Sequence, residues 1–294
     1  MANYMFLNIL KLLRPKQWIK NAFLFAALVF SGNFFTVTLL PINILAFIIF
    51  CLLSSSIYIF NDICDRELDK NHPLKCKRPI ASGTVSTRSA WVTFIVLFCS
   101  SLLGAYFVNI NFLIICAVYA ALMLYYSIIL KNLPIIDVMV ISAGFVLRAV
   151  AGGAAVHIFV SPWLIVCTML FSLFLALNKR KSEMDNAAAA GHTEDQKDSR
   201  KVLQTYTPQL LQTMISSVDG AAILSYCMYS ISLSNRNMIV TIPFVIYGLF
   251  RYQMVTSVKG SAESAEEVLL EDKPLLINMI LWVIACIVII YFIR

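Results

Sequence analysis

The chain has 294 residues, of which 60% are hydrophobic and only 13% are charged. This balance is far more apolar than that of a soluble domain, so the composition excludes an ordinary water-soluble fold. The formal net charge of +7 does not require a nucleic-acid partner, and none is expected. Lys and Arg that flank apolar helices are more simply explained as topology signals and lipid-headgroup contacts.

Continuous apolar runs fill most of the chain, and nine of them can cross a hydrocarbon core of about 30 Å as helices. The runs are continuous instead of alternating, which predicts helices and not a β-barrel. The expected fold class is therefore all-α, with a nine-helix transmembrane bundle that forms one domain over residues 1–294. The expected spans are residues 18–38, 42–60, 90–108, 110–128, 134–156, 160–177, 210–232, 237–252 and 274–293.

The charged residues are concentrated on one side of this predicted bundle. If the N-terminus is cytoplasmic, 20 of the 23 Lys and Arg residues lie in or at the edge of inner segments, as the positive-inside rule requires. None of the 16 acidic residues lies in an outer loop. We therefore expect a multi-pass protein of the inner (plasma) membrane, with its C-terminus outside and its working surface in the cytoplasm. The expected cytoplasmic loops lie near residues 61–89, 178–209 and 253–273.

A polar motif follows the second span, with Asn61, Asp62, Asp65 and Asp69 at helical spacing. If the helix continues past Asn61, the three carboxylates share one face, where like charges repel by roughly 0.2–0.5 kcal/mol per pair. A divalent cation would reverse the sign of this interaction. Mg²⁺ takes one or two carboxylates and completes its shell with waters and phosphate oxygens. The motif therefore predicts a magnesium-diphosphate site in which the three aspartates are also the catalytic residues.

A basic run, Lys75, Lys77 and Arg78, lies just beyond the aspartates. Ammonium and guanidinium groups bind phosphate oxygens, so this run is expected to contact the same diphosphate. The alternative interpretation of the whole segment is a solvated helix end with mixed charges. Ionisable groups at the mouth of an apolar bundle are functional more often than not, which favours the binding site.

Asn61, Asp62, Asp65 and Asp69 match in full the NDxxDxxxD signature of the UbiA superfamily of intramembrane prenyltransferases, which the chain resembles over its whole length. The resemblance implies a nine-helix bundle with a side-opening central cavity that binds a polyprenyl chain and magnesium-diphosphate at its cytoplasmic end. More specifically, four stretches resemble the decaprenyl-phosphate phosphoribosyltransferase branch of the superfamily. These stretches are residues 14–21, 78–83, 137–153 and 266–270.

The resemblance to that branch implies a particular reaction. Its enzymes move 5-phosphoribose from phosphoribosyl diphosphate onto a polyprenyl phosphate, for the synthesis of cell-envelope glycan precursors. The lipid is then the acceptor, and the usual stereochemistry of the superfamily implies inversion from α to β at the anomeric carbon. A lipid phosphate is already anionic near neutral pH, so no general base is required, which agrees with the lack of a candidate histidine.

The sequence departs from the commoner members of the superfamily at one place. Those enzymes carry a second motif, DxxxD, in the inner loop after the sixth helix. Here a basic triplet stands at that place, and of the acids that follow it, Glu183 is the best candidate to replace the motif. Phosphoribosyl diphosphate has a 5-phosphate that prenyl diphosphates lack, so the additional cations favour the phosphoribosyl donor. An ordinary positive-inside cluster is the alternative interpretation.

Further candidates lie inside the spans. Asp137 and Arg148 are separated by 11 residues, which is three helical turns on one face, and both are expected to face the cavity. An arginine inside a membrane is costly and usually has a partner, so Arg148 forms either a structural ion pair or an anion contact. The residues expected to bind substrate or phosphate are Arg14, Lys16, Gln17, Lys20, Asn21, Lys75, Lys77, Arg78, Asp137, Arg148, Lys179, Arg180 and Glu183.

The expected partners are phosphoribosyl diphosphate, a polyprenyl phosphate, Mg²⁺ and the membrane, and a homo-oligomer is left open. An aromatic polyprenyltransferase with a prenyl diphosphate donor is one alternative. A transporter is the alternative from another class, because charged residues in apolar helices also mark ion paths. Transporters often show related halves, however, and the sequence has no convincing internal repeat.

Overall fold

The computed structural model describes residues 10–71, 75–189, 205–232, 236–259, 268–269 and 271–293. Every regular element in these ranges is a helix, which confirms the all-α class. Parts of the predicted loops, and Glu266, Glu267 and Leu270 of the last resembling stretch, lie outside the described residues. The chain divides into two compact units. The first comprises Met1–Leu28, Asn33–Val140 and Leu147–Phe159, and the second Val29–Gly32, Ile141–Val146 and Val160–Arg294.

Eight helices in the described part of the chain are long and apolar enough to cross a membrane, so this is a multi-pass membrane protein. They correspond to the second through ninth predicted spans. These helices are α3 (Leu39–Cys64), α5 (Thr87–Val108), α6 (Ile110–Ile128), α7 (Ile136–Ala155), α8 (Pro162–Ala189), α9 (Pro208–Ser232), α10 (Ile242–Lys259, preceded by the 3₁₀ helix η6, Arg236–Thr241) and α12 (Lys273–Phe292).

The first predicted span, residues 18–38, is not one helix. It consists of a 3₁₀ helix, η1 (Pro15–Phe25), followed by the short α2 (Ala26–Phe30). A 3₁₀ helix rises about 2.0 Å per residue and an α-helix about 1.5 Å, so together they extend for about 30 Å. The count of nine transmembrane helices is therefore not confirmed, although these residues have the length that a crossing needs.

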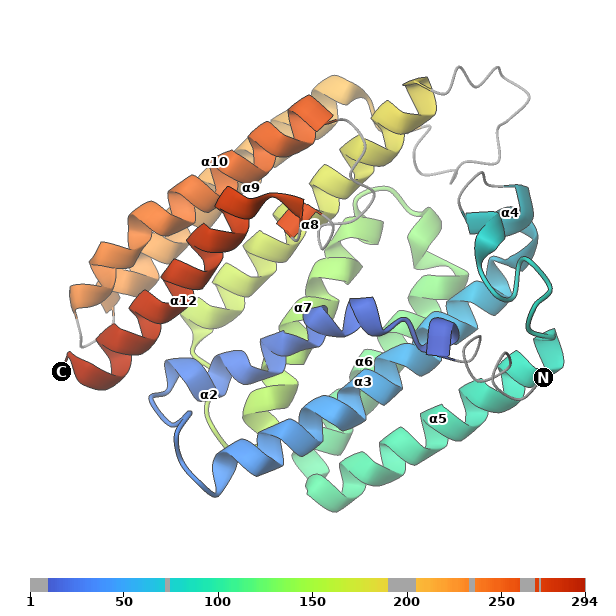
Figure 1. Ribbon diagram of the computed structural model, residues 1–294, viewed down its shortest axis with the longest axis horizontal. Helices are drawn as coiled ribbons and strands as arrows, with labels where there is room; N and C mark the ends of the chain where they lie inside the picture. The colour runs from blue at the N-terminus through green and yellow to red at the C-terminus, as the bar shows by residue number, and fades with distance from the viewer. Residues whose placement is uncertain are drawn as a thin grey trace. The chain divides into compact units, whose positions relative to one another are not determined.

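The main core of the first unit lies between α3, α5, α6 and α7. Helices α3 and α5 run side by side (Figure 1). Fully buried large side chains, among them Phe50, Phe112 and Tyr119, fill this core. Helix η1 reaches α7 closely, because a Cβ atom at Gly152 would lie 1.8 Å from the carbonyl oxygen of Leu24. Only a glycine permits this approach of the two backbones.

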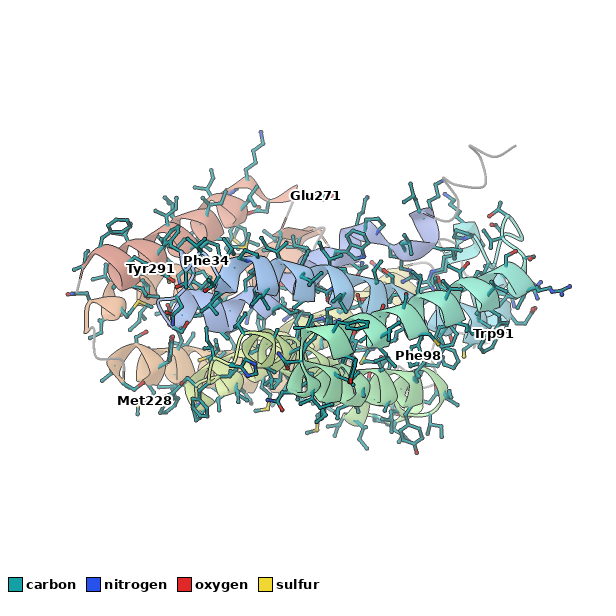
Figure 2. All side chains as sticks on the ribbon, turned by 90° about the horizontal axis from the view of Figure 1, so that it is seen from below. Phe34, Trp91, Phe98, Met228, Glu271 and Tyr291 are labelled. Carbon is teal, nitrogen blue, oxygen red and sulfur yellow. The ribbon has the colours of Figure 1, made fainter. Side chains whose placement is uncertain are left out.

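A row of aromatic side chains joins the end of α3 to α5. Phe60 packs against Trp91 and Phe94, with ring centroids 5.9 and 5.4 Å away. Phe98 continues the row one turn further, 5.4 Å from Phe94, and Figure 2 labels Trp91 and Phe98 along this helix. Each such pair contributes about 0.5–1.5 kcal/mol beyond its buried area. The row therefore anchors the end of α3 at which Asn61 follows Phe60.

In the second unit, α8 packs beside α9 and α10 beside α12 (Figure 1). Polar contacts also tie α9 to α12 and to η6. The indole N–H of Trp282 in α12 donates to the hydroxyl of Tyr226 in α9 at 2.9 Å, and Tyr226 shares a 2.7 Å hydrogen bond with Thr241 in η6. Because unpaired polar groups are expensive in an apolar environment, each of these contacts stabilises the helix packing.

Candidate functional site

The acidic motif lies at the junction of two helices. Helix α3 continues beyond its predicted end at residue 60, and α4 (Arg66–Asn71) follows almost at once. The Asp65 amide donates to the Asn61 carbonyl at 2.9 Å and the Asp69 amide to the Asp65 carbonyl at 2.8 Å, so the helical pattern crosses the junction. This confirms the helical spacing assumed for the motif. Asp62, Asp65 and Asp69 are all buried, with 3%, 9% and 4% of their surface exposed.

Two arginines from other segments hold Asp62 and Asp69. Nη2 of Arg14 donates to Oδ1 of Asp62 at 2.5 Å. Nη1 of Arg78 donates to the same oxygen at 3.1 Å and to Oδ2 of Asp69 at 2.6 Å. One nitrogen of Arg78 therefore bridges two buried carboxylates, and charge-assisted hydrogen bonds of this kind are among the strong ones in proteins.

Asp65 has a different cation. Lys131 donates to one of its carboxylate oxygens, and the Asn61 side-chain amide donates to the other at 3.0 Å. Lys131 lies in η3 (Leu130–Asn132), the short connection between α6 and α7. The candidate residues taken from the sequence did not include Lys131. The available signal was its position, because it is the one charged residue in a short inner segment between two spans.

Three basic side chains thus face three aspartates, so the cluster is formally neutral without a metal ion. The sequence predicts that a divalent cation offsets the repulsion among the aspartates. In the structure, Arg14, Arg78 and Lys131 from other segments of the chain also offset it. The metal ion itself stays a prediction.

A small apolar cluster positions the charged side chains. Its buried members come from the segments that carry the charges, and burial of one such side chain contributes about 1.5–3 kcal/mol. The anchors are Leu12, Ile59 and Ile80, which lie two or three residues from Arg14, Asp62 and Arg78 respectively. Because each charge is so close to an anchor, packing of the cluster fixes where the charged groups meet.

Two connections that carry site residues have strained backbone. The φ angle is +50° at Arg14 and +69° at Ile135, in the turn that follows Lys131. Left-handed backbone at a residue other than glycine costs about 1–3 kcal/mol and persists only where the surroundings impose it. Such strain is concentrated at functional sites, which supports a functional role for this cluster.

Burial perturbs the acidity of one motif carboxyl that lies outside the spans. It raises the pKa of Asp69 above its ordinary value, although Arg78 and Lys75 act in the opposite direction. The cause is that a low-dielectric environment disfavours the charged form. A carboxylate in this position gains more than an exposed one from additional positive charge.

Two carboxylates of the aspartate motif lie close enough together to bind a metal ion. Among the described residues, no three His, Cys, Asp or Glu side chains are grouped to hold a metal. Asp62 and Asp69 nevertheless converge on the same nitrogen of Arg78. Mg²⁺ commonly uses one or two carboxylates together with waters and substrate phosphate oxygens. The donor set therefore fits a hard cation that arrives with a phosphate ligand.

Arg148 and Asn21 form a second polar cluster in the first unit. Arg148 donates to the side-chain oxygen of Asn21 at 2.9 Å and to the Tyr119 hydroxyl at 2.8 Å. Its guanidinium lies 5.8 Å from the Phe50 ring centroid and 4.9 Å from that of Tyr119. Asn21 in turn donates to Ser54 at 3.0 Å. These contacts join η1 to α3, α6 and α7, which favours a structural role for Arg148.

The other candidates of the first unit lie in η1, in the 3₁₀ helix η2 (Lys75–Lys77) and in α7. Lys20 donates to Gln17 at 2.6 Å within η1. Lys16 and Lys77 are exposed. Asp137 is buried in the first turn of α7, where the helix dipole favours a negative charge. Their roles in binding substrate therefore stay predictions.

The segment expected to be a loop after the sixth span begins as helix. Helix α8 continues far past residue 177, so Lys179, Arg180 and Glu183 lie on its last turns, and the loop prediction was wrong for this part. Arg180 is only 1% exposed and donates to Glu183 at 2.5 Å. Lys181 donates to Gln212 of α9 at 2.7 Å. A local ion pair thus engages two residues that were expected to bind phosphate.

Comparison with known families and proteins gives a consistent result. Residues 21–268 match the UbiA prenyltransferase family. A decaprenyl-phosphate phosphoribosyltransferase of Corynebacterium glutamicum is 33% identical to this chain and covers 97% of it and 87% of its own length. The protein of the same name from Mycolicibacterium smegmatis is 34% identical and covers 94% of this chain and 90% of its own length.

Solved structures share the fold. A UbiA homologue from Archaeoglobus fulgidus, bound to GPP and Mg²⁺, aligns over 96% of this chain and 99% of its own with a TM-score of 0.71. The same homologue bound to Cd²⁺ gives a TM-score of 0.70. Sequence identity to both is 19%, so this likeness is evidence for the fold alone.

Proposed function

The chain belongs to the UbiA prenyltransferase family, and we propose that it transfers the 5-phosphoribosyl group of phosphoribosyl diphosphate to a decaprenyl-type polyprenyl phosphate. The observation that carries this proposal is that its relatives named decaprenyl-phosphate phosphoribosyltransferase match nearly its whole length. The product would serve the synthesis of cell-envelope glycan precursors. The buried aspartate cluster, with basic residues from three separate segments, supports the use of two phosphorylated substrates.

In the proposed reaction the bond between the ribose anomeric carbon and the diphosphate oxygen breaks, and its electron pair leaves with diphosphate. An oxygen of the lipid phosphate forms the new bond to the same carbon. Asp62 and Asp69 would hold Mg²⁺, and Asn61 and Asp65 stay its further predicted ligands. When bound, the ion would neutralise the negative charge that develops on the leaving diphosphate.

The chain's own cations have the main task, which is to bring two polyanions together. Arg14, Arg78 and Lys131 lie at the aspartates and can reach the phosphate oxygens of a ligand bound there. A guanidinium binds phosphate through two parallel hydrogen bonds, which orients the group as well as holding it. Orientation of this kind accounts for a large share of the barrier reduction in reactions between two bound substrates.

The proposal includes an orientation in the inner membrane. The N-terminus and the aspartate cluster would face the cytoplasm and the C-terminus the outside, which requires residues 15–30 to make a ninth crossing. Their length of about 30 Å supports this. A reporter active only in the cytoplasm, fused after the last residue, should be inactive. An active reporter would contradict this orientation.

The activity is tested with purified protein, radiolabelled phosphoribosyl diphosphate, polyprenyl phosphate and Mg²⁺. A labelled lipid should form with release of diphosphate, and the Asp62→Ala variant should not form it. Transfer of a prenyl group from a prenyl diphosphate to an aromatic acid would indicate the aromatic prenyltransferase instead. Uptake of a solute into vesicles without any chemical product would indicate a transporter.

A further inference from the structure

Arg78 occupies the point on which two motif carboxylates converge. Its Nη1 atom lies 3.1 Å from Oδ1 of Asp62 and 2.6 Å from Oδ2 of Asp69. Both carboxylates are buried, whereas the Arg78 side chain keeps 26% of its surface exposed. The guanidinium therefore enters a buried acidic site from a more accessible position.

A metal ion and this guanidinium compete for the same place. Both need the facing oxygens of Asp62 and Asp69, and two positive charges at contact distance repel strongly where the dielectric constant is low. A metal ion alone would have to displace Arg78 from two charge-assisted hydrogen bonds. If no other anion were near, the displaced Arg78 would lose the stabilisation of these two hydrogen bonds and gain nothing in return.

We propose that Arg78 is an exchangeable counter-ion that keeps free metal out of the aspartate site and moves onto the donor's diphosphate when metal and diphosphate enter together. Diphosphate offers Arg78 new oxygen partners, so the exchange replaces its two carboxylate contacts instead of abolishing them. Entry of metal then depends on the presence of a diphosphate group. This inference rests on the proposed function, because it assumes that the aspartates are the metal-diphosphate site.

The proposal predicts how metal binding depends on diphosphate and on Arg78. Binding of Mn²⁺ to the purified full-length protein is measured by electron paramagnetic resonance, with and without inorganic pyrophosphate. The wild type should bind Mn²⁺ weakly alone and much more tightly with pyrophosphate. Arg78→Gln should bind Mn²⁺ alone about ten-fold more tightly than the wild type, because a competing cation and its charge-assisted hydrogen bonds are gone. The additional gain from pyrophosphate should shrink in this variant.

Two matched variants separate this effect from general changes of charge. Arg78→Lys keeps a cation in place, so its affinity for Mn²⁺ alone should stay near the wild-type value. Arg88→Gln makes the same change of charge at an exposed position in the first turn of α5 and should bind Mn²⁺ as the wild type does. Thermal unfolding in detergent shows whether each variant is folded.

The results distinguish failure of this inference from failure of the proposed function. If the wild type binds Mn²⁺ with pyrophosphate but Arg78→Gln shows no tighter binding of Mn²⁺ alone, the counter-ion role is wrong and the site stands. If the wild type binds Mn²⁺ tightly without pyrophosphate, the counter-ion role is again wrong, and this result does not depend on whether Arg78→Gln folds. If it binds no Mn²⁺ under either condition, the metal site and the exchange both fail.

Discussion

Each of the two units holds a buried aspartate with an arginine, but the two contacts distribute charge differently. In the second unit, Arg251 forms two hydrogen bonds of 3.0 and 2.8 Å with Asp272. The same carboxylate accepts the backbone N–H of Leu275 at 2.9 Å and so caps α12. Here one guanidinium pairs with one carboxylate. The same carboxylate also accepts the free backbone N–H at the beginning of a helix.

In the first unit, one nitrogen of Arg78 is shared by Asp62 and Asp69, and Arg14 contacts Asp62 as well. None of these contacts is a two-point pairing of one guanidinium with one carboxylate. Each oxygen can therefore change its partner without unfolding a helix end. A closed pair therefore serves stability, whereas a shared cation leaves carboxylate oxygens that a ligand can engage.

The largest difference should appear when each carboxylate is made neutral without a change of size. Asp62→Asn should reduce phosphoribosyl transfer about 10³-fold, or about 4 kcal/mol in the barrier, because two cations and the metal site lose a charge partner. Asp272→Asn, the matched change in the closed pair, should leave the specific activity near wild type and lower the free energy of unfolding by about 1–3 kcal/mol.

Both quantities are measured on the same purified preparations, by product formation from labelled donor and by thermal unfolding in detergent. If the two variants lose activity to the same degree, the distinction between the shared and the closed contact is wrong.

The sequence predicted the carboxylates of this site and included two of their three cations, Arg14 and Arg78, among the phosphate-binding residues, but it did not predict that these cations pair with the aspartates. Helical spacing correctly placed Asp62, Asp65 and Asp69 in one continuous pattern, because i to i+4 geometry is local. The cation of Asp65 is 66 residues away, and one of the two cations of Asp62 is 48 residues away. Such contacts are set by helix packing, which no local period encodes. The fold class and eight spans were predictable for the same local reason, because each is a property of one apolar run.

The misjudged ends of the helices have a related cause. Hydropathy marked α8 as ending at residue 177, where the charged residues begin, but Arg180 and Glu183 neutralise each other within the helix and allow it to continue. Similarly, apolar composition could not distinguish a 3₁₀ from an α-helix at residues 15–25. The 3₁₀ conformation occurs where this segment contacts Gly152 closely, and such a contact is a feature of tertiary structure.

The next largest effect should come from the packing that brings η1, and with it Arg14, into place. Gly152→Ala puts a Cβ atom 1.8 Å from the carbonyl oxygen of Leu24, so the two backbones must separate. The expected loss is about 3 kcal/mol of unfolding free energy, with reduced activity. Gly220→Ala is the control, because its Cβ would meet nothing within 4 Å; it should be neutral or stabilising by up to about 1 kcal/mol. Equal thermal stability of the two variants would contradict the close contact.

A smaller effect should follow from removing the cation that the sequence did not reveal. Lys131→Gln leaves Asp65 with the Asn61 amide and no counter-ion of its own. Transfer activity should fall roughly 30-fold, or about 2 kcal/mol, because this charge serves both the carboxylate and the incoming phosphates. Lys70→Gln, which removes an exposed ion pair with Glu67 in the neighbouring α4, should change activity less than two-fold. An unchanged activity of Lys131→Gln would exclude Lys131 from the site.

The smallest effect tests whether a local pair in the second unit behaves like the closed contact. Glu183→Gln removes the charge opposite buried Arg180 but keeps an oxygen that can accept the same hydrogen bond. The loss should be about 1 kcal/mol of unfolding free energy, the difference between a charge-assisted and a neutral hydrogen bond. Activity should change less than three-fold, because the pair forms within one helix and is complete without substrate. If Glu183→Gln lost as much activity as Asp62→Asn and kept its thermal stability, Glu183 would instead belong to the residues that bind substrate. The measurement therefore decides whether the basic end of α8 is a second binding surface or a stabilised helix terminus.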